Sequence, residues 1–243
     1  MISLFKKEIS VFFGSFIGYI IIGLFLVTNS IILWSDYSTL NILDYGYANM
    51  DLFFSIAPLL LILLVPGLSM RIFTEEYNTG TIETLLTKPI SLFKIVLSKY
   101  FAVFFLVLIA ILPTLLFYVT TLYFIGETVG NIDLASIFGS YIGLILLSSL
   151  FVSISIFSSV LTTNQITAFI TAIILCLLFY YGFDLLSELP FFNFIDLTIK
   201  KFGISYHYNF LSKGLIRISD IIYFLSMTLL FLKINTEIIK NKR

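Results

Sequence analysis

The sequence is poor in the side chains that carry most protein chemistry. Its 243 residues include one cysteine, Cys176, and one histidine, His207. A single cysteine excludes an intrachain disulfide and any metal site built from several cysteines. Serine–histidine, cysteine–histidine and two-histidine zinc sites would all have to use the one imidazole ring. We therefore interpret His207 as a residue of a membrane interface rather than of a catalytic site.

Charge is scarce as well. Charged residues make up 12% of the chain and hydrophobic residues 59%, whereas a soluble domain carries about 25% charged residues. The formal net charge is zero, so there is no basic surplus that would attract nucleic acid. This composition predicts an all-α integral membrane protein that is surrounded by membrane lipid and has no nucleic-acid partner.

Six apolar stretches are long enough to cross a bilayer, whose hydrocarbon core needs roughly 20 helical residues. They are Phe16–Trp34, Leu52–Met70, Tyr100–Ile125, Ile137–Leu161, Ile166–Leu186 and Ile221–Ile239. No repeat or low-complexity linker divides them, so residues 1–243 are expected to form a single transmembrane domain. Pro58, Pro66 and Pro113 are interpreted as tolerated kinks, with broken helices as the alternative. An ionisable group near the middle of a span is not evident, which argues against an ion-coupled carrier.

The basic residues predict the orientation. The loops Ser35–Asp51 and Gly126–Ser136 contain no lysine or arginine, whereas the side with both termini is rich in them. That side holds Lys6, Lys7, Arg71, Lys88, Lys94, Lys99, Lys233, Lys240, Lys242 and Arg243, and the other side holds Lys200, Lys201, Lys213 and Arg217. Because cytoplasmic loops carry the excess of positive charge, we expect both termini in the cytoplasm.

Two segments outside the spans are expected to lie at the membrane surface. Residues 1–15 include an amphipathic pattern over Ile2–Phe13. Its apolar face is formed by Ile2, Phe5, Ile9, Phe12 and Phe13, and its polar face by Ser3, Lys6, Lys7 and Ser10. A plain extension of the first span is the alternative. Residues 187–220 mix aromatic and charged side chains, which suits short external re-entrant or interfacial helices separated at Gly203 and Gly214.

The fourth span carries small residues at helical spacing. These are Gly139, Gly143, Ser149, Ser153, Ser155 and Ser159. Small residues four apart let two helix backbones approach closely. Packing within the chain is the favoured interpretation, and a dimer interface is the alternative.

A polar segment, residues 71–99, separates the second and third spans. Its informative residues are Glu75, Glu76, Gly80, Thr81, Glu83, Leu85, Leu86 and Pro89. Helical spacing of Glu83, Leu86 and Ile90 predicts a short helix, which Thr81 would cap and Pro89 would end.

Three functional interpretations compete for this segment. The adjacent glutamates resemble those of intramembrane CAAX-type proteases, but those enzymes need an arginine where Gly80 stands, and histidines on other spans that this chain lacks. A solvated loop without a partner is the second interpretation. The third is a coupling element, a short cytoplasmic helix that docks into a groove of a soluble motor and transmits its movement to the spans.

The third interpretation agrees with a resemblance to a known family. The segments FTEE, GTIETLL and KPIS resemble the signature of type-2 ABC transporter permeases. Within that family the chain is most similar to the gliding-motility-associated permease subunit of Bacteroidota. This similarity lies in KKEISVFFGSFIGYI, NILDYGYANMD, VGNIDLASIFGSYIGL, NQITAFI, FYYGF and SKGLIRISDIIYFL.

The resemblance implies a half-transporter of the bacterial cytoplasmic (inner) membrane. Such a permease pairs with a second copy or a different permease subunit and recruits a separate ABC ATPase, which binds ATP and Mg²⁺. The chain itself contains no G-x-x-x-x-G-K-[ST] phosphate loop, so we expect neither a cofactor nor an enzyme activity of its own. Such permeases have an N-terminal elbow helix, a cytoplasmic coupling segment and short external helices. The resemblance assigns these parts to residues 1–15, 71–99 and 187–220 of this chain.

We expect the Thr81–Leu86 helix to move with the motor. Leu85 and Leu86 would be its apolar anchors, and Glu75, Glu76 and Glu83 would form ion pairs with basic residues of the motor or of this chain's own spans. A link to gliding motility or secretion follows from the resemblance. A non-transporting membrane scaffold of that apparatus is the alternative function.

Overall fold

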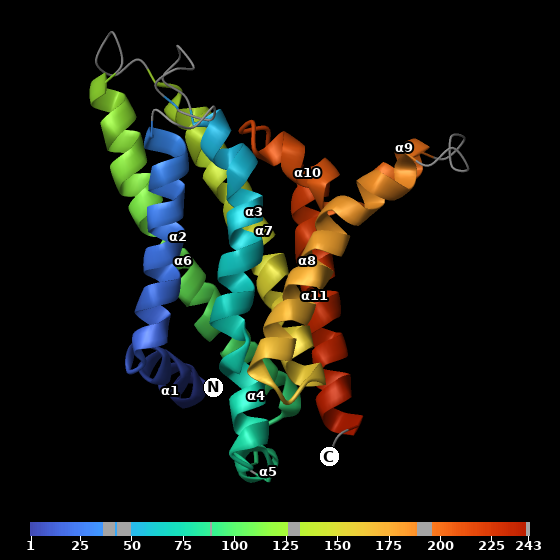
Figure 1. Ribbon diagram of the computed structural model, residues 1–243. Helices are drawn as coiled ribbons and strands as arrows, with labels where there is room; N and C mark the ends of the chain where they lie inside the picture. The colour runs from blue at the N-terminus through green and yellow to red at the C-terminus, as the bar shows by residue number, and fades with distance from the viewer. Residues whose placement is uncertain (36–41, 43–49, 88, 126–131, 189–195, 242–243) are drawn as a thin grey trace.

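The computed structural model describes residues 1–35, 42, 50–87, 89–125, 132–188 and 196–241, and most of these residues are helical (Figure 1). Six helices are long and apolar enough to cross a membrane. They are α2 (Phe16–Trp34), α3 (Asp51–Ser69), α6 (Leu92–Ile125), α7 (Leu134–Leu161), α8 (Gln165–Ser187) and α11 (Ile218–Asn241). The predicted all-α chain with six candidate spans is therefore confirmed. Lys88, most of NILDYGYANMD and residues 189–195 of the external segment lie outside the described residues.

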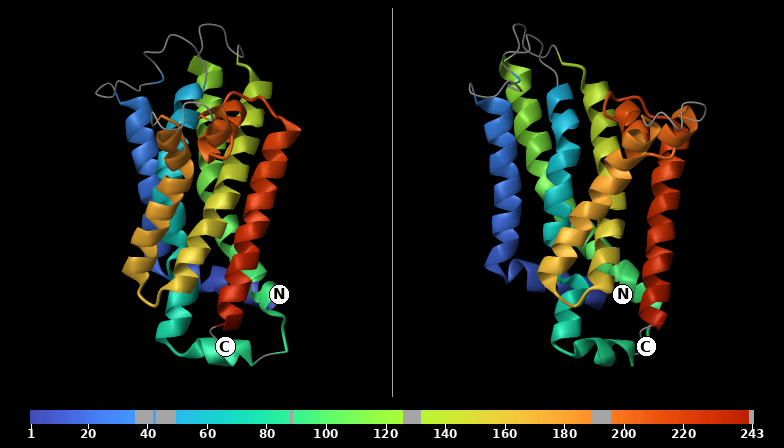
Figure 2. Two further views of the ribbon diagram at one scale, coloured as in Figure 1. Left: turned by 90° about the vertical axis from the view of Figure 1, so that its right-hand side faces the viewer. Right: turned by 45° about the vertical axis from the view of Figure 1, so that its right-hand side comes forward.

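Five shorter helices lie at the two ends of this bundle. They are α1 (Ile2–Phe13), α4 (Arg71–Asn78), α5 (Thr81–Leu86), α9 (Asp196–Lys200) and α10 (Ile204–Leu211). Figure 1 shows α1, α4 and α5 at the end that holds both chain termini, hereafter the terminal end, and α9 and α10 at the opposite end. In both views of Figure 2, α1 and α5 run across the bundle rather than along it.

Helix α1 has the predicted bounds. Its predicted polar residues are exposed, namely Ser3, Lys6, Lys7 and Ser10, and four of its predicted apolar residues are half-buried, namely Phe5, Ile9, Phe12 and Phe13. Leu4 is buried, whereas Ile2 is 73% exposed. The side chain of Glu8 is also largely covered. Because α1 packs mainly on α6, the inward face is set by that contact and not only by the apolar residues of α1.

Helix α6 begins earlier than its apolar run. The prediction was Tyr100, but the helix starts at Leu92 and includes Lys94 and Lys99. Its 34 residues make a rod of roughly 50 Å, longer than the ~30 Å hydrocarbon core. The additional turns therefore project from the terminal end. Pro113 lies inside α6, as Pro58 and Pro66 do inside α3, so the tolerated-kink interpretation holds for these helices.

Helix α7 is the centre of the bundle. In the most apolar 18-residue stretch of α7, 78% of the residues are buried, compared with 22% in the corresponding stretches of α2 and of α8. It packs against α3, α6, α8 and α11. Its small side chains allow this crowding, and their hydroxyl groups bond to carbonyls of the same helix, as Ser148 does to Ile145 (2.8 Å) and Ser153 to Leu150 (2.7 Å). Serine can thus be buried in a membrane helix without an unpaired polar group.

The small-residue face of α7 packs within the chain. A Cβ atom built on Gly139 would lie 2.7 Å from the carbonyl oxygen of Gly214, and one built on Gly143 would lie 2.5 Å from Leu211. Ser149, Ser153, Ser155 and Ser159 are all buried. The favoured interpretation agrees with this packing, and these residues are not accessible for a dimer interface in this conformation.

A buried carboxylate organises the opposite end. Asp220, with no exposed surface, lies 2.7 Å from Nδ1 of His207 and accepts a 2.9 Å bond from Nε of Arg217. Nε2 of His207 lies 2.9 Å from the carbonyl oxygen of Lys201. These contacts join α10 to the first turn of α11. Gly214, in the connection between them, has φ +75°, a conformation that favours glycine.

We expect Gly139→Ala to destabilise the fold by about 1–3 kcal/mol, because the added methyl group meets backbone atoms that cannot rotate away. Gly23→Ala is the matched control, since a Cβ atom at Gly23 has nothing within 4 Å. The unfolding midpoint of each purified variant is the measurement. Equal midpoints would contradict the close approach of Gly214 to α7.

Candidate functional site

The polar segment between the second and third spans is largely helical. Its first part, α4, follows α3 with only Met70 between them, and Met70 itself has helical backbone angles. Residues Asp51–Asn78 therefore form one nearly continuous rod. A displacement of the far end of α4 would be carried into α3 because no loop separates them.

The central residue of the site is Lys99 on α6. Its side chain is 1% exposed. The ammonium group donates to Glu8 of α1 (2.9 Å) and to the carbonyl of Ile72 (2.7 Å), and it lies 2.9 Å from the carboxylate of Glu76. A lysine has three donor hydrogens, so three acceptors satisfy it completely. The ring of Phe73 adds a cation–π contact at 4.9 Å.

Glu76 is the second member of this ion cluster. It is 6% exposed, and its Oε1 also accepts from Lys7 of α1 at 3.3 Å. Two carboxylates and two ammonium groups thus balance one another where α1, α4 and α6 meet. The predicted ion pair between a coupling-segment glutamate and a basic residue of this chain's own spans is present at Glu76. Removing one partner of such a pair leaves an uncompensated buried charge.

A second set of contacts joins α4 to the core helix α7. The backbone N–H of Phe73 donates to the hydroxyl of Ser159 (3.1 Å), and that hydroxyl donates to the carbonyl of Met70 (3.3 Å). Ser159 was predicted as part of a small-residue packing face. Its hydroxyl fills a gap in the hydrogen bonding at the α3–α4 junction, so it contributes a polar contact as well as a small volume.

Gly80 separates α4 from α5. It has φ +68°, and its N–H donates to the carbonyl of Tyr77 at 3.3 Å, which is typical of a glycine that ends a helix. Thr81 was expected to cap α5, but Gly80 is the residue before the helix and Thr81 is its first member. The hydroxyl of Thr81 lies 2.9 Å from that of Thr79 instead. Pro89 lies beyond the helix, which ends at Leu86.

Helix α5 has one face toward the chain and one toward solvent. Ile82 and Leu85 are buried, whereas Thr81, Glu83 and Thr84 are exposed. Leu85 therefore does not present the apolar anchor that the sequence suggested, because the rest of this chain covers it. Leu86 belongs to α5, and its side chain lies outside the described residues. The exposed side chains of α5 that the structure describes are polar.

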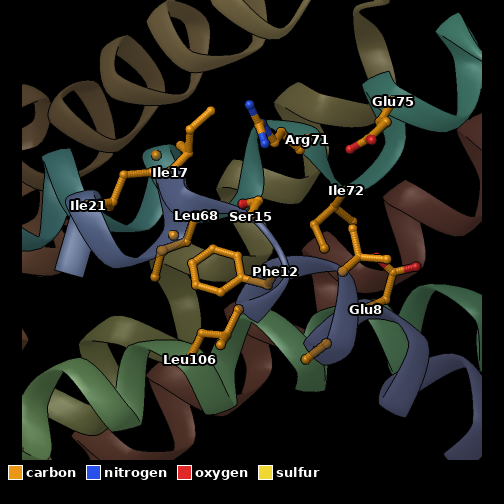
Figure 3. A pocket seen from close by; sticks show the side chains of 14 residues that line it. Glu8, Phe12, Ser15, Ile17, Ile21, Leu68, Arg71, Ile72, Glu75 and Leu106 are labelled. Atoms are coloured by element: carbon orange, nitrogen blue, oxygen red, sulfur yellow. The ribbon is translucent and has the colours of Figure 1, made fainter.

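Glu75 forms no ion pair with the described residues of the ion cluster. It is exposed, and it lines a cavity of about 100 Å³ under the α1–α2 connection together with Arg71 and Glu8. Figure 3 shows these charged side chains beside Phe12 and Ile21, which form the apolar part of the lining. The two adjacent glutamates of the sequence thus have different surroundings, Glu76 in the ion cluster and Glu75 at this cavity.

Sequence reasoning missed Lys99, Glu8 and Lys7 as members of the site. Lys99 was used only as an indicator of orientation, and Lys7 as such an indicator and as part of the polar face of α1. One signal was present: on a helix, Lys99 shares a face with residues three, four and seven positions away, and five of these six apolar residues are buried, namely Ile95, Val96, Ala102, Val103 and Leu106, while Leu92 is half-buried. A lysine at the centre of an apolar stripe must be paired, which predicts an acidic partner nearby.

Comparison with known families adds to this geometry. A family described as ABC-2 family transporter protein matches residues 36–232, which is more than half of the chain. The chain belongs to the ABC-2 transporter family. None of the curated proteins with which it was compared matches it. The match begins after α2, so Lys7 and Glu8 of the ion cluster lie outside it and Glu76 and Lys99 lie inside it.

Membership establishes the general character of the protein. An ABC-2 permease is the transmembrane component of an ABC transporter and works with an ABC ATPase partner. The six apolar helices agree with a multi-pass membrane protein. The ABC-2 permease is not itself the nucleotide-binding enzyme.

We expect Lys99→Met to lower the stability of the ABC-2 permease by about 3–5 kcal/mol, because Glu8 would lose its cation and buried Glu76 would keep only the half-exposed Lys7. Lys94→Met is the control, since Lys94 is exposed on the same helix. Unfolding of the purified variants gives the comparison. Adding Glu8→Gln and Glu76→Gln to Lys99→Met should restore part of the loss, and an unchanged loss would argue against charge as its cause.

Gly80→Ala tests the turn between α4 and α5. Nothing lies within 4 Å of a Cβ atom at Gly80, so the cost comes from the left-handed backbone alone, about 1–2 kcal/mol. We expect hydrogen exchange of the α5 amides to become about tenfold faster. Gly182→Ala, inside α8, should leave α5 exchange unchanged. Equal exchange in all three proteins would contradict a conformational role for Gly80.

Proposed function

We propose that this ABC-2 permease couples ATP hydrolysis by a separate ABC ATPase to transport across the bacterial cytoplasmic membrane. In this proposal both termini are cytoplasmic, α1 is the elbow helix, α5 is the coupling helix and α9 and α10 are the external helices. The concentration of basic residues at the terminal end supports this orientation. The position of α5, which projects from the terminal end beyond the spans (Figures 1 and 2), supports its contact with a soluble partner.

The observation that carries the proposal is the buried ion cluster around Lys99. Closure of the ATPase displaces α5, and α4 moves with it because only a short turn at Gly80 separates them. The displacement passes directly to α3, since α4 continues that helix. It passes to α6 and α1 through Lys99, which holds Glu76 and Glu8 at the same distance, 2.9 Å.

The contact with the ATPase is proposed to be polar at its rim. Among the described side chains of α5, Thr81, Glu83 and Thr84 are exposed, and Glu83 is the charged one, so we assign to it the contact with basic residues of the ATPase. Glu76 acts differently, because it is buried and binds this chain's own lysines. We therefore assign Glu83 to the contact with the partner and Glu76 to the internal connection.

We also propose that the permease pairs with a second permease subunit, a copy or a different chain, to complete the transporter. The sequence resemblance to the gliding-motility-associated subunit supports a role beside the gliding or secretion machinery. Transport-stimulated ATP hydrolysis in reconstituted vesicles tests the transporter assignment. ATP hydrolysis without any transported substrate would favour the non-transporting scaffold.

Glu83→Arg is expected to reduce recovery of the ATPase with the purified permease by about tenfold or more, because juxtaposed like charges at an interface cost several kcal/mol. Glu237→Arg is the control, since Glu237 is also exposed at the terminal end, on α11. Co-purification from membranes that contain both subunits is the measurement. Equal ATPase recovery with the two variants would count against docking through α5.

A further inference from the structure

An apolar groove runs along the outside of the bundle between α2, α3 and the start of α8. Its volume is about 500 Å³ and its lining is almost entirely apolar, including Ile20, Leu24, Leu63, Leu64, Ile166 and Phe169. Sites for small molecules commonly measure about 300–1,000 Å³. Because the groove lies along membrane-spanning helices, its occupant must be soluble in hydrocarbon.

The groove meets the cavity under the α1–α2 connection. Ile17, Ile21 and Gly67 line both of them. A Cβ atom at Gly67 would lie in ordinary contact with Ile21, 3.4 Å away, so α2 and α3 approach each other closely at this junction. An apolar channel along the spans thus ends in a space lined by charged groups, as Figure 3 shows for Arg71, Glu75 and Glu8. This is the shape of a lipid with a polar head and an acyl chain.

The side chain of Arg71 is the strongest indication that the cavity binds a lipid head group with a phosphate. Its Nε is buried, and among the described residues it has no hydrogen-bond partner. A buried N–H group without an acceptor is unfavourable. Phosphate is the anion that a guanidinium group binds best, through paired hydrogen bonds. The position of Arg71, at the end of the apolar span α3, is the depth at which lipid phosphates lie.

The carboxylates that line the same cavity indicate whether the head group is zwitterionic or anionic. Glu75 lines the same cavity and forms no ion pair with a described residue, whereas Glu8 is neutralised by Lys99. The lining of the cavity therefore includes both a guanidinium group and a carboxylate. A zwitterionic head group with a phosphate and a primary ammonium matches this pair, while an anionic head group would add negative charge beside Glu75.

We propose that the groove and the cavity together bind one resident phosphatidylethanolamine molecule. One acyl chain lies along α2 and α3, the phosphate accepts hydrogen bonds from Arg71, and the ammonium group donates to Glu75. The bound lipid fills the space between α1 and the α3–α4 rod. This proposal requires only that the chain is embedded in a membrane. It can therefore be correct whether or not the permease couples ATP hydrolysis to transport.

Native mass spectrometry of the purified full-length permease tests this site after exchange with vesicles of equal phosphatidylethanolamine and phosphatidylglycerol content. Wild type should retain phosphatidylethanolamine in preference. Arg71→Gln should lower retention about tenfold or more, because a charge-assisted hydrogen bond is lost. Glu75→Gln should keep phospholipid bound but lose the preference between the two lipids. Lys94→Gln is the control, since Lys94 is an exposed basic residue outside the cavity.

A second pair of variants tests the groove without altering any charge. Leu63 is 50% exposed and lines the groove, whereas Leu59 is 47% exposed one turn away and does not. Leu63→Trp should displace the acyl chain and lower retention about tenfold, and Leu59→Trp should not. This comparison remains informative if Arg71→Gln fails to fold.

Four results would overturn the proposal. They are absence of retained phospholipid in wild type, equal retention by Arg71→Gln and Lys94→Gln, preference of wild type for phosphatidylglycerol, and equal retention by the two tryptophan variants. If Leu63→Trp instead separated two paired permease chains with lipid retention unchanged, the groove would be an interface between chains. None of these results depends on the ATPase.

Discussion

The arrangement of the terminal end depends on one buried ammonium group. Lys99 holds a carboxylate of α1, a carboxylate of α4 and a backbone carbonyl of α4 around a single atom. Separating any of these elements exposes a charge to a poorly solvated space, which costs several kcal/mol. Three elements that are distant in the sequence therefore behave as one unit, and a force applied to α4 must displace α1 and α6 or break an ion pair.

The two attachments of α4 differ in strength, and the difference predicts how it moves. Besides side-chain packing, the described contacts with α7 are neutral hydrogen bonds of the Ser159 hydroxyl, from Phe73 of α4 and to Met70 just before α4, each worth about 0.5–1.5 kcal/mol. Its contacts with α6 and α1 are charge-assisted, worth about 1.5–3 kcal/mol each. We therefore expect α4 to shift along α7 while keeping α6 and α1 with it. The most buried span, α7, would then serve as the fixed reference against which the other helices move.

Much of this fold could be predicted, because apolar runs and amphipathic patterns are local signals. The bounds of α1 followed from them, and so did a short helix after Gly80, although α5 includes Thr81 and ends at Leu86, before Pro89. The ion cluster could not be found in that way, since Glu8 and Lys99 are 91 positions apart and only folding brings them together. The start of α6 was also missed, because Lys94 and Lys99 lower the hydropathy of its first turns, which are already helical. The burial of Leu85 was missed for the same reason: the surface that covers it is not local.

Helix α1 shows why these contacts matter jointly. It lies outside the segment that matches the ABC-2 family, yet Glu8 takes part both in the ion cluster and in the lining of the lipid-sized cavity. Its position is thus set from one side by Lys99 and from the other by whatever fills the space beneath the α1–α2 connection. A lipid head group there would press α1 against α6 and keep water from the cluster. The stability of the ion pairs would then depend on membrane composition, since a lower local dielectric strengthens every charge interaction inside it.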